Sequence, residues 1–354
     1  ALLTEVVVAV GRVFAVRFDQ LHNDSTSVRF SGQYRDAHGR SIRGRRAPWI
    51  TYGYSKDHRP DLKQLLFVLT TSADGGIPVQ FRCHDGNVSD SVTHVETWEA
   101  LRRVTGRSDF LYVADSKLCS RECMDPITQA GGRFVTVIPR SRSEDAHFRE
   151  WIQTNVPVWE TVWNRPNPRR KYGPRDVWRV CRAPLPSREA WPVTWVSSAL
   201  LTLHQEHRRH DRLARALQDL DRLKRRLATP RTRLRKRSEL KKCVDRILRR
   251  MKVGRYLKVR LLRTEEPHFR QERRGRPGPN TRYRKLIRHK LDLAWELDQA
   301  AIDYDRKSDG MYPLLTNDRA LTARQVLVAH KGQPTIEKRF RQMKAVYEIA
   351  PVLL

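Results

Sequence analysis

The stretch DFLYVADSK, residues 109–117, is the strongest structural signal in the sequence, because a nearly continuous apolar run ends at an acidic residue, Asp115. A short apolar run of this kind is typical of a strand that is buried on both faces of a sheet. A carboxylate at the end of such a strand usually serves a function, since an unpaired charge is costly to bury. We therefore interpret this stretch as a central strand and Asp115 as a candidate site residue.

The segments around this strand predict a mixed sheet flanked by helices. Three strands precede it, and helix, strand, helix and strand patterns then alternate to residue 140. Around the central strand, these segments are, in chain order, residues 25–34, 62–73, 77–87, 89–106, 120–132 and 133–140. Three antiparallel strands followed by αβαβ is the order of an RNase H-like α/β fold. The apolar residues 5–18 could form either a strand or the end of a helix.

The charge of the chain is concentrated in one region. The 354 residues include 70 Lys+Arg and 39 Asp+Glu, for a formal net charge of +31. Residues 201–290 alone hold 32 Lys+Arg and 9 Asp+Glu, and so contribute +23 of that total. Such an excess opposes compaction unless a polyanion neutralises it, and nucleic acid is the obvious candidate. An acidic membrane is the competitor, but no apolar run of about 18 residues indicates a spanning helix.

The basic region contains a predicted αα-hairpin at about 204–251, with leucines at helical spacing on one narrow face. Two possible strands follow it, at residues 255–263 and 290–302, and the loop RRGRPGPNTRYR, residues 273–284, lies between them. We expect this region to be a basic insertion that interrupts the sheet domain. The predicted domains are 1–140 for the first part of the core, 141–305 for the insertion, and 306–354 for the last part of the core.

The five cysteines are few and odd in number, which indicates a reducing compartment without a disulfide framework. We expect a cytoplasmic protein. Cys119 and Cys123, together with the HVE stretch at 94–96, raise the alternative of a zinc nucleobase deaminase. However, that site requires a Pro-Cys-x-x-Cys stretch, and the spacing here is Cys-x-x-x-Cys without the proline.

Three acidic residues lie where an RNase H-like sheet would bring them together. They are Asp24 near the first strand, Asp115 at the end of the fourth, and Glu337 on a predicted helix near the C-terminus. Cleaving a phosphodiester at neutral pH requires an activated water and a stabilised leaving oxygen, and two Mg²⁺ ions roughly 4 Å apart supply both. Mg²⁺ prefers oxygen ligands and keeps several waters, so a few carboxylates suffice. A turn cap for Asp24 and an Arg341 ion pair for Glu337 remain as structural alternatives.

Six segments in this order resemble bacterial insertion-sequence transposases of the DDE class, in the IS-four superfamily. They are HNDSTS (22–27), GYSKDHRPDLKQLLF (53–67), DGGIPVQFRCHDGNVSD (74–90), LYVADSKL (111–118), DGMYPLLTND (309–318) and IEKRFRQMK (336–344). The resemblance implies an RNase H-like core that an insertion domain interrupts between the second aspartate and the glutamate. It also implies that Asp24, Asp115 and Glu337 are the catalytic metal ligands, for two Mg²⁺ ions that Mn²⁺ can replace.

The resemblance further implies the reaction and the partners. The family cuts transposon ends with a metal-activated water, and the freed 3′ hydroxyl then attacks target DNA. The expected partners are terminal inverted repeats, target DNA and a second copy of the chain in a synaptic dimer at the nucleoid, with no membrane. The candidate DNA-binding residues are Lys56, Arg59, Arg274, Arg276, Lys338, Arg341 and Lys344.

The sequence departs from the family at one signature, in which Tyr, Arg, Glu and Lys are separated by two, three and six residues. Glu337 and Lys344 fit this spacing, whereas His330 stands at the Tyr place and Gln333 at the Arg place. Gln333 cannot offer phosphate the charged bidentate fork of Arg. A decayed or truncated transposase that only binds DNA is therefore the main alternative, and a simple nuclease or resolvase is a third.

Overall fold

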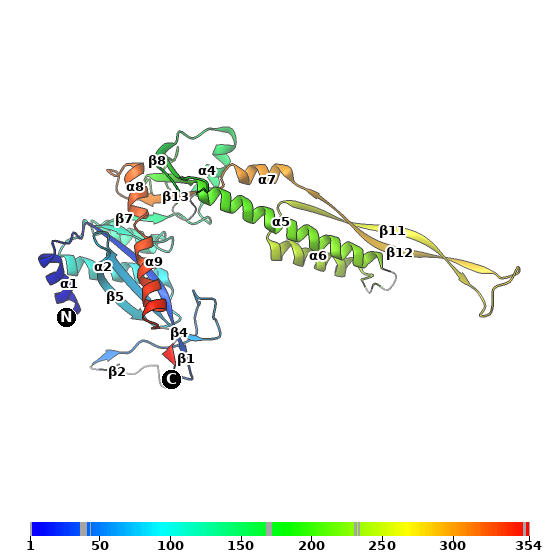
Figure 1. Cartoon of the computed structure of the whole chain (residues 1–354), viewed down its shortest axis with the longest axis horizontal. Coiled ribbons are helices and arrows are strands. Elements are labelled where there is room, and N and C mark those ends of the chain that lie inside the picture. The colour runs from blue at the N-terminus through cyan, green and yellow to red at the C-terminus, as the bar shows by residue number, and fades with distance from the viewer. Residues whose placement is uncertain are drawn as a thin grey trace. The chain divides into compact units, whose positions relative to one another are not determined.

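The computed structural model describes residues 2–35, 41–42, 44–167, 172–229, 232, 234–349 and 352–353. The chain forms two compact units, Ala1–Ser198 with Met311–Leu354, and Ala199–Gly310 (Figure 1). None of the described helices is long and apolar enough to cross a membrane.

The first unit is built on one mixed sheet, whose main path runs β5-β4-β1-β6-β7-β13-β10-β9-β8. These strands are β1 (Gln20–Ser31), β4 (Lys63–Ser72), β5 (Pro78–His84), β6 (Leu111–Val113), β7 (Arg133–Val137), β8 (Glu160–Arg165), β9 (Asp176–Arg182), β10 (Val193–Ser198) and β13 (Met311–Thr316). β1, β4 and β5 are antiparallel neighbours, and β6 and β7 continue from β1 in parallel. This is the strand order of an RNase H-like sheet, so the predicted fold class is confirmed.

The central strand β6 is buried on both of its faces, because helices cover each side of the sheet there. Tyr112 belongs to the cluster that contains Trp98 of α2 and Met124 of α3. Val113 belongs to a second cluster with Val326 of α8. The helices of this unit are α1 (Leu2–Val13), α2 (Thr93–Thr105), α3 (Arg121–Gln129), α4 (Ser143–Thr154), α8 (Ala323–His330) and α9 (Pro334–Arg341).

Several short elements complete the first unit. They are β2 (Ser41–Ile42), β3 (Arg45–Arg46), the 3₁₀ turn η1 (Asp90–Val92), the π-helical turn η2 (Gln342–Val346) and β14 (Val352–Leu353), which pairs with β1.

Three features differ from the sequence-based expectations. The ambiguous N-terminal stretch is a helix over Leu2–Val13, and β1 begins at Gln20, so Asp24 lies within the strand and does not open it. The strands β8, β9 and β10 extend the main sheet through pairing of β10 with β13. The second unit therefore begins at Ala199, whereas the sequence analysis placed the start of the insertion at residue 141.

The second unit contains the predicted αα-hairpin and a long two-stranded ribbon. Its elements are α5 (Ala199–Ala228), α6 (Arg237–Met251), β11 (Leu257–Gln271), β12 (Tyr283–Leu297) and α7 (Gln299–Arg306). Leu220 and Leu227 of α5 and Leu240 of α6 are buried in one apolar cluster with Leu293 of β12. The unit thus has a core of its own, formed by the narrow apolar faces that the leucine spacing predicts.

We expect Leu220→Ala to lower the free energy of unfolding of the second unit by about 2–5 kcal/mol, as for other fully buried leucines. Leu220 is 0% exposed, whereas Leu203 on the same helix is 44% exposed and makes Leu203→Ala a matched control. Urea unfolding monitored by hydrogen exchange in α5 and α6 measures the loss. Equal effects of the two substitutions would contradict this packing.

Candidate active site

Parallel pairing of β1 with β6 brings two acidic residues to neighbouring positions. The paired residues are Gln20 with Leu111, Leu21 with Tyr112, and His22 with Val113. Asp24 and Asp115 each lie two residues beyond the last pair, on strands that are about 4.8 Å apart in such a sheet. The register of two short strands therefore places the two carboxylates beside each other.

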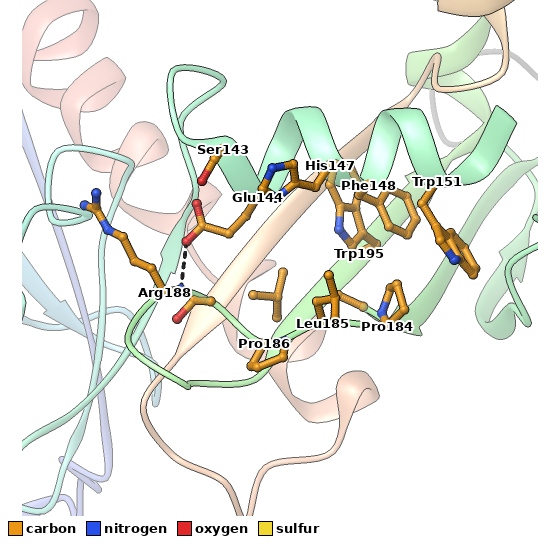
Figure 2. A pocket seen from close by; sticks show the side chains of 13 residues that line it. Ser143, Glu144, His147, Phe148, Trp151, Pro184, Leu185, Pro186, Arg188 and Trp195 are labelled. Atoms are coloured by element: carbon orange, nitrogen blue, oxygen red, sulfur yellow. Dashed lines mark hydrogen bonds between the residues drawn. The ribbon is translucent and has the colours of Figure 1, made fainter.

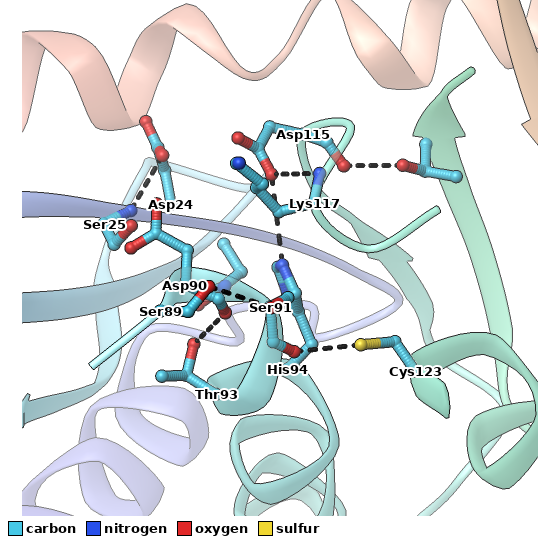
Figure 3. A network of polar contacts seen from close by, with 12 residues as sticks. Asp24, Ser25, Ser89, Asp90, Ser91, Thr93, His94, Asp115, Lys117 and Cys123 are labelled. Atoms are coloured by element: carbon cyan, nitrogen blue, oxygen red, sulfur yellow. Dashed lines mark hydrogen bonds and ion pairs between the residues drawn. The ribbon is translucent and has the colours of Figure 1, made fainter. Parts of the chain in front are cut away.

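The ionised form of the Asp24 carboxyl is disfavoured by its surroundings (Figure 3). Burial raises the pKa of Asp24 to about 6, and the negative charges of Asp115 and Asp90 add to that rise. The charge of Lys56 and a hydrogen bond from the Ser25 amide, 2.7 Å to Oδ1, lower it in part. At neutral pH Asp24 is thus ionised at a cost in free energy, which a bound cation would offset.

The side chain of Asp115 is more open than that of Asp24. It is 44% exposed, and its Oδ1 accepts a hydrogen bond of 3.0 Å from the Lys117 amide. Its backbone carbonyl accepts a 2.6 Å bond from the Thr136 hydroxyl. These bonds fix the backbone at the end of β6 and leave carboxylate oxygen free for a ligand.

Asp90 and His94, which the sequence analysis did not place with the three acids, complete this network (Figure 3). Asp90 Oδ2 lies 2.8 Å from the Nζ of Lys56. The same ammonium donates to the carbonyl of Ser25, at 2.8 Å, and to its hydroxyl, at 2.6 Å. Lys56, predicted to bind DNA, is therefore occupied within the site, where it anchors the residue next to Asp24.

His94 of α2 lies close to Asp115. Its Nδ1 shares a 3.1 Å hydrogen bond with the Tyr112 hydroxyl, and its Nε2 lies 3.9 Å from Asp115 Oδ1. Burial lowers the pKa of His94 to about 4, against the opposing charge of Asp115. The imidazole is therefore neutral at pH 7, and it does not compete with a cation for the carboxylate.

Glu337 lies on α9, which runs beside β1. The Gln333 amide donates to the carbonyl of Asn23 at 2.8 Å and accepts from His22 Nδ1 at 3.2 Å. Ile336 of the same helix packs on Leu69, the residue paired with Asp24. Glu337 follows Gln333 by one helical turn, and its side chain is exposed.

The three predicted acids do not form a preassembled cluster. Within the described part of the chain, no group of three or more His, Cys, Asp or Glu side chains is placed to hold a metal ion. The structure therefore brings Asp24 and Asp115 together, and leaves Glu337 exposed on the neighbouring helix.

The two departures from the family signature have structural roles here. His330 is buried with its ring 5.7 Å from that of Tyr312, and burial lowers its pKa to about 4. Gln333 holds α9 against β1 through the two bonds described above. Lys331, which follows His330 in the chain, lies over the Trp178 ring at 3.8 Å. Two neutral side chains, those of His330 and Gln333, thus stand at the places where Tyr and Arg are expected, and both have packing roles.

The remaining candidate DNA contacts fall into two groups. Arg59 pairs with Asp61 at 2.7 Å, and Lys344 pairs with Asp57 at 2.8 Å, so both cations have partners. The others are exposed, and they are Lys338 and Arg341 in the first unit and Arg274 and Arg276 in the second.

An apolar pocket of about 240 Å³ lies between α4 and residues 183–188 (Figure 2). Trp151, Phe148 and Trp195 line it, and at its rim Glu144 accepts a 3.2 Å hydrogen bond from the Arg188 amide. Its lining includes none of Asp24, Asp90 and Asp115, and its one carboxylate, that of Glu144, is paired with Arg142.

The cysteine alternative finds no support in the geometry. Burial raises the pKa of Cys119 to about 11, and Cys123 donates to the Ser91 carbonyl at 2.9 Å. Among the residues that the structure describes, neither thiol belongs to a group of three or more side chains that could hold a metal ion.

We expect Asp24→Asn to raise the melting temperature of the metal-free protein above pH 6, by about 2–4 °C for each kcal/mol relieved. A raised carboxyl pKa favours folding below the ordinary value, and this advantage is lost as pH rises through about 6. The difference between the two proteins should therefore grow between about pH 4 and pH 6. Thermal melts in EDTA measure it, with Asp125→Asn on α3 as the control. A difference that does not change with pH would refute a strained Asp24.

Comparison with known proteins agrees with this geometry. Residues 20–180 match the family model described as a transposase DDE domain. No curated protein matches the chain in sequence. A crystal structure of the Mos1 mariner paired end complex with Mn aligns with 43% of this chain and 46% of its own, at 11% identity and a TM-score of 0.22. The chain spans about half of that protein's length. Residues 20–180, which include both Asp24 and Asp115, are thus similar to a transposase DDE domain.

Proposed function

We propose that the protein cuts DNA at transposon ends and joins the freed 3′ hydroxyl to target DNA. One observation carries this proposal: Asp24 and Asp115 occupy corresponding positions on adjacent parallel strands of a transposase DDE domain. Asp24 is ionised there at a cost, with its pKa raised to about 6. Two such carboxylates are suited to a divalent cation beside a scissile phosphate.

The residues present fit a divalent metal. Carboxylate oxygens are hard donors, as Mg²⁺ requires, and Asp24 and Asp115 supply them from rigid strands. We infer two Mg²⁺ ions, replaceable by Mn²⁺, with Glu337 of α9 as the third ligand. When bound, the metal would supply water activation and stabilisation of the leaving oxygen.

The surrounding residues position these acids. Lys56 holds the Ser25 backbone, and Asp90 in turn holds the Lys56 ammonium, so the charge beside Asp24 is fixed in place. Neutral His94 packs against Asp115 without repelling a cation. Gln333 fixes α9 next to Asn23, and we infer that Glu337 of this helix joins the two carboxylates when the metal binds.

The proposed partners follow from the reaction. We infer that the protein binds the terminal inverted repeats of its element and a target duplex, as a homodimer, on the nucleoid of a bacterial cytoplasm. Lys338 and Arg341 are exposed on the helix that contains Glu337, and we assign them to DNA phosphates near the cleavage site.

The alternative is a decayed transposase that only binds DNA. Two observations favour it: the three acids are not preassembled, and a neutral Gln333 stands where the family has Arg. Strand cleavage of the element's own terminal repeats, with Mg²⁺ or Mn²⁺, discriminates the two functions. Binding without cleavage would favour the decayed protein, and joined products would separate a transposase from a simple nuclease.

We expect Asp115→Asn to reduce strand cleavage by about 10³-fold or more, because metal coordination supplies several kcal/mol of transition-state stabilisation. DNA affinity should stay within about threefold, since the substitution removes no phosphate contact. Gel assays of cleavage and fluorescence anisotropy of binding measure the two effects, with Asp125→Asn as the control. Full cleavage activity in Asp115→Asn would defeat the assignment.

We expect Glu337→Gln to reduce cleavage by a comparable factor, on the order of 10²–10³, if Glu337 completes the metal site. Glu348→Gln is the control, because it removes another exposed glutamate close to the same end of the chain. Activity at several Mg²⁺ and Mn²⁺ concentrations shows whether the loss lies in metal affinity. Unchanged cleavage at limiting metal would remove Glu337 from the site and leave the two aspartates.

A further inference from the structure

The ribbon formed by β11 and β12 has two different halves. The strands pair without interruption from Leu257 with Leu297 to Gln271 with Tyr283. Near its base, one face packs on the core of the second unit through Leu257, Leu291 and Leu293. Figure 1 shows the ribbon continuing beyond the ends of α5 and α6. We call residues 268–290 the distal ribbon.

The distal ribbon has a strong excess of positive charge. Its only acidic residue is Glu272. Its basic residues are Arg270, Arg273, Arg274, Arg276, Arg282, Arg284, Lys285, Arg288 and Lys290. All but Lys290 are exposed. A segment this basic is typical of a surface that binds a polyanion.

Cations at the two ends of the ribbon differ in their pairing. At the base, Lys258 lies 2.7 Å from Asp298, and Arg260 lies 3.2 Å from Glu296. Lys290, at the boundary of the distal ribbon, lies 3.3 Å from Glu266. In contrast, the other eight basic side chains of the distal ribbon form no ion pair with any described residue. The protein therefore neutralises the charge at the base of the ribbon, but not the charge of its distal half.

One cross-strand pair is unfavourable for the free protein. Arg270 lies directly opposite Arg284 in the register, so the two side chains share one face of the ribbon. Like charges at directly opposite positions destabilise an antiparallel pair. Arg288 lies on the same face, because residues separated by an even number point to one side. It stands opposite Glu266, which pairs with Lys290. Neither Arg270 nor Arg284 forms an ion pair with a described residue, and a bound anion would relieve their repulsion.

We propose that the distal ribbon is a DNA-binding arm, whose face with Arg270, Arg284 and Arg288 contacts the phosphates that border a groove. A two-stranded β-ribbon fits the major groove of B-DNA, about 12 Å wide. The choice of DNA as the polyanion rests on the proposed function. The choice of this face of the ribbon rests on the register, exposure and charge of β11 and β12.

A protein partner is the less favoured occupant. The opposite face of the distal ribbon exposes Phe269 and Ile287, at 59% and 58%. Those residues could contact protein, but a second copy of this chain also has a net charge of +31 and would be repelled by the arginine face. The unpaired arginines therefore favour DNA over a second copy.

The test is DNA binding by the full chain with Asp115→Asn as background, so that cleavage does not interfere. Binding to a duplex is followed by fluorescence anisotropy across a salt series. We expect Arg270→Gln with Arg284→Gln to reduce the slope of log affinity against log salt by about 2, since each phosphate contact contributes about 0.9. Lys258→Gln with Arg260→Gln, which removes two paired cations of the same ribbon, should change the slope by less than about 0.5.

Two further measurements keep the result interpretable. Without DNA, the melting temperature of the Arg270/Arg284 variant should be unchanged or higher, because the repulsion is relieved. Phe269→Ser with Ile287→Ser should preserve DNA affinity.

An unchanged salt slope in the arginine variant would overturn the proposal. Loss of self-association in the Phe269/Ile287 variant, with binding by the arginine variant intact, would overturn it in favour of a protein contact. Cleavage by the chain with Asp115 intact is measured separately. If the protein binds DNA through the distal ribbon but does not cut it, the proposed function is rejected and the DNA-binding role of the distal ribbon is kept.

Discussion

The close approach of two carboxylates on β1 and β6 is the constraint on which the site depends. Their positions follow from strand register, because Asp24 and Asp115 each lie two residues past the last backbone pair. A sheet cannot relax this proximity without losing its register, and a shift by one residue would turn every side chain to the other face. The electrostatic cost is visible in Asp24, whose pKa rises to about 6 because the carboxyl is buried beside other acids. A protein that keeps such a pair must gain from it, and holding a divalent cation is the gain that the geometry favours.

The polar residues around this pair limit the cost without removing it. Lys56 places one positive charge near Asp24, but Asp90 shares that charge at 2.8 Å. His94, buried and neutral, adds no second positive charge. The site therefore keeps an excess of negative charge that Lys56 offsets only in part. This excess favours binding of a cation, and the offset allows the protein to fold without one. On the face of the sheet that Asp24 shares with Leu69, Gln333 anchors α9 to β1 through a neutral hydrogen bond to the Asn23 carbonyl.

Local sequence patterns predicted the core strands and two of the acids, because each of those strands is short and buried. Asp115 was recognisable since it follows the apolar residues of β6 directly. Asp90 and His94 gave no such signal, because an acid at a helix start and a histidine on a helical face have ordinary structural explanations. Their role depends on β6 and α2 packing together. The attachment of β8, β9 and β10 to the main sheet was also not predictable, since it depends on pairing between β10 and β13, more than a hundred residues apart.

The length of the distal ribbon could not be predicted from the sequence, for a different reason. Apolar patterns predicted only short strands at the base, where burial selects the residues, whereas β11 and β12 continue to Gln271 and Tyr283. Beyond the core, backbone hydrogen bonds alone maintain the pairing, and the side chains are free to serve another purpose. There the sequence places Arg270 opposite Arg284, against the preference for complementary cross-strand pairs. A local rule broken without compensation in the folded chain is expected at functional surfaces, because the missing partner is then the ligand. The repulsion on this ribbon is thus best explained as a cost that DNA removes on binding.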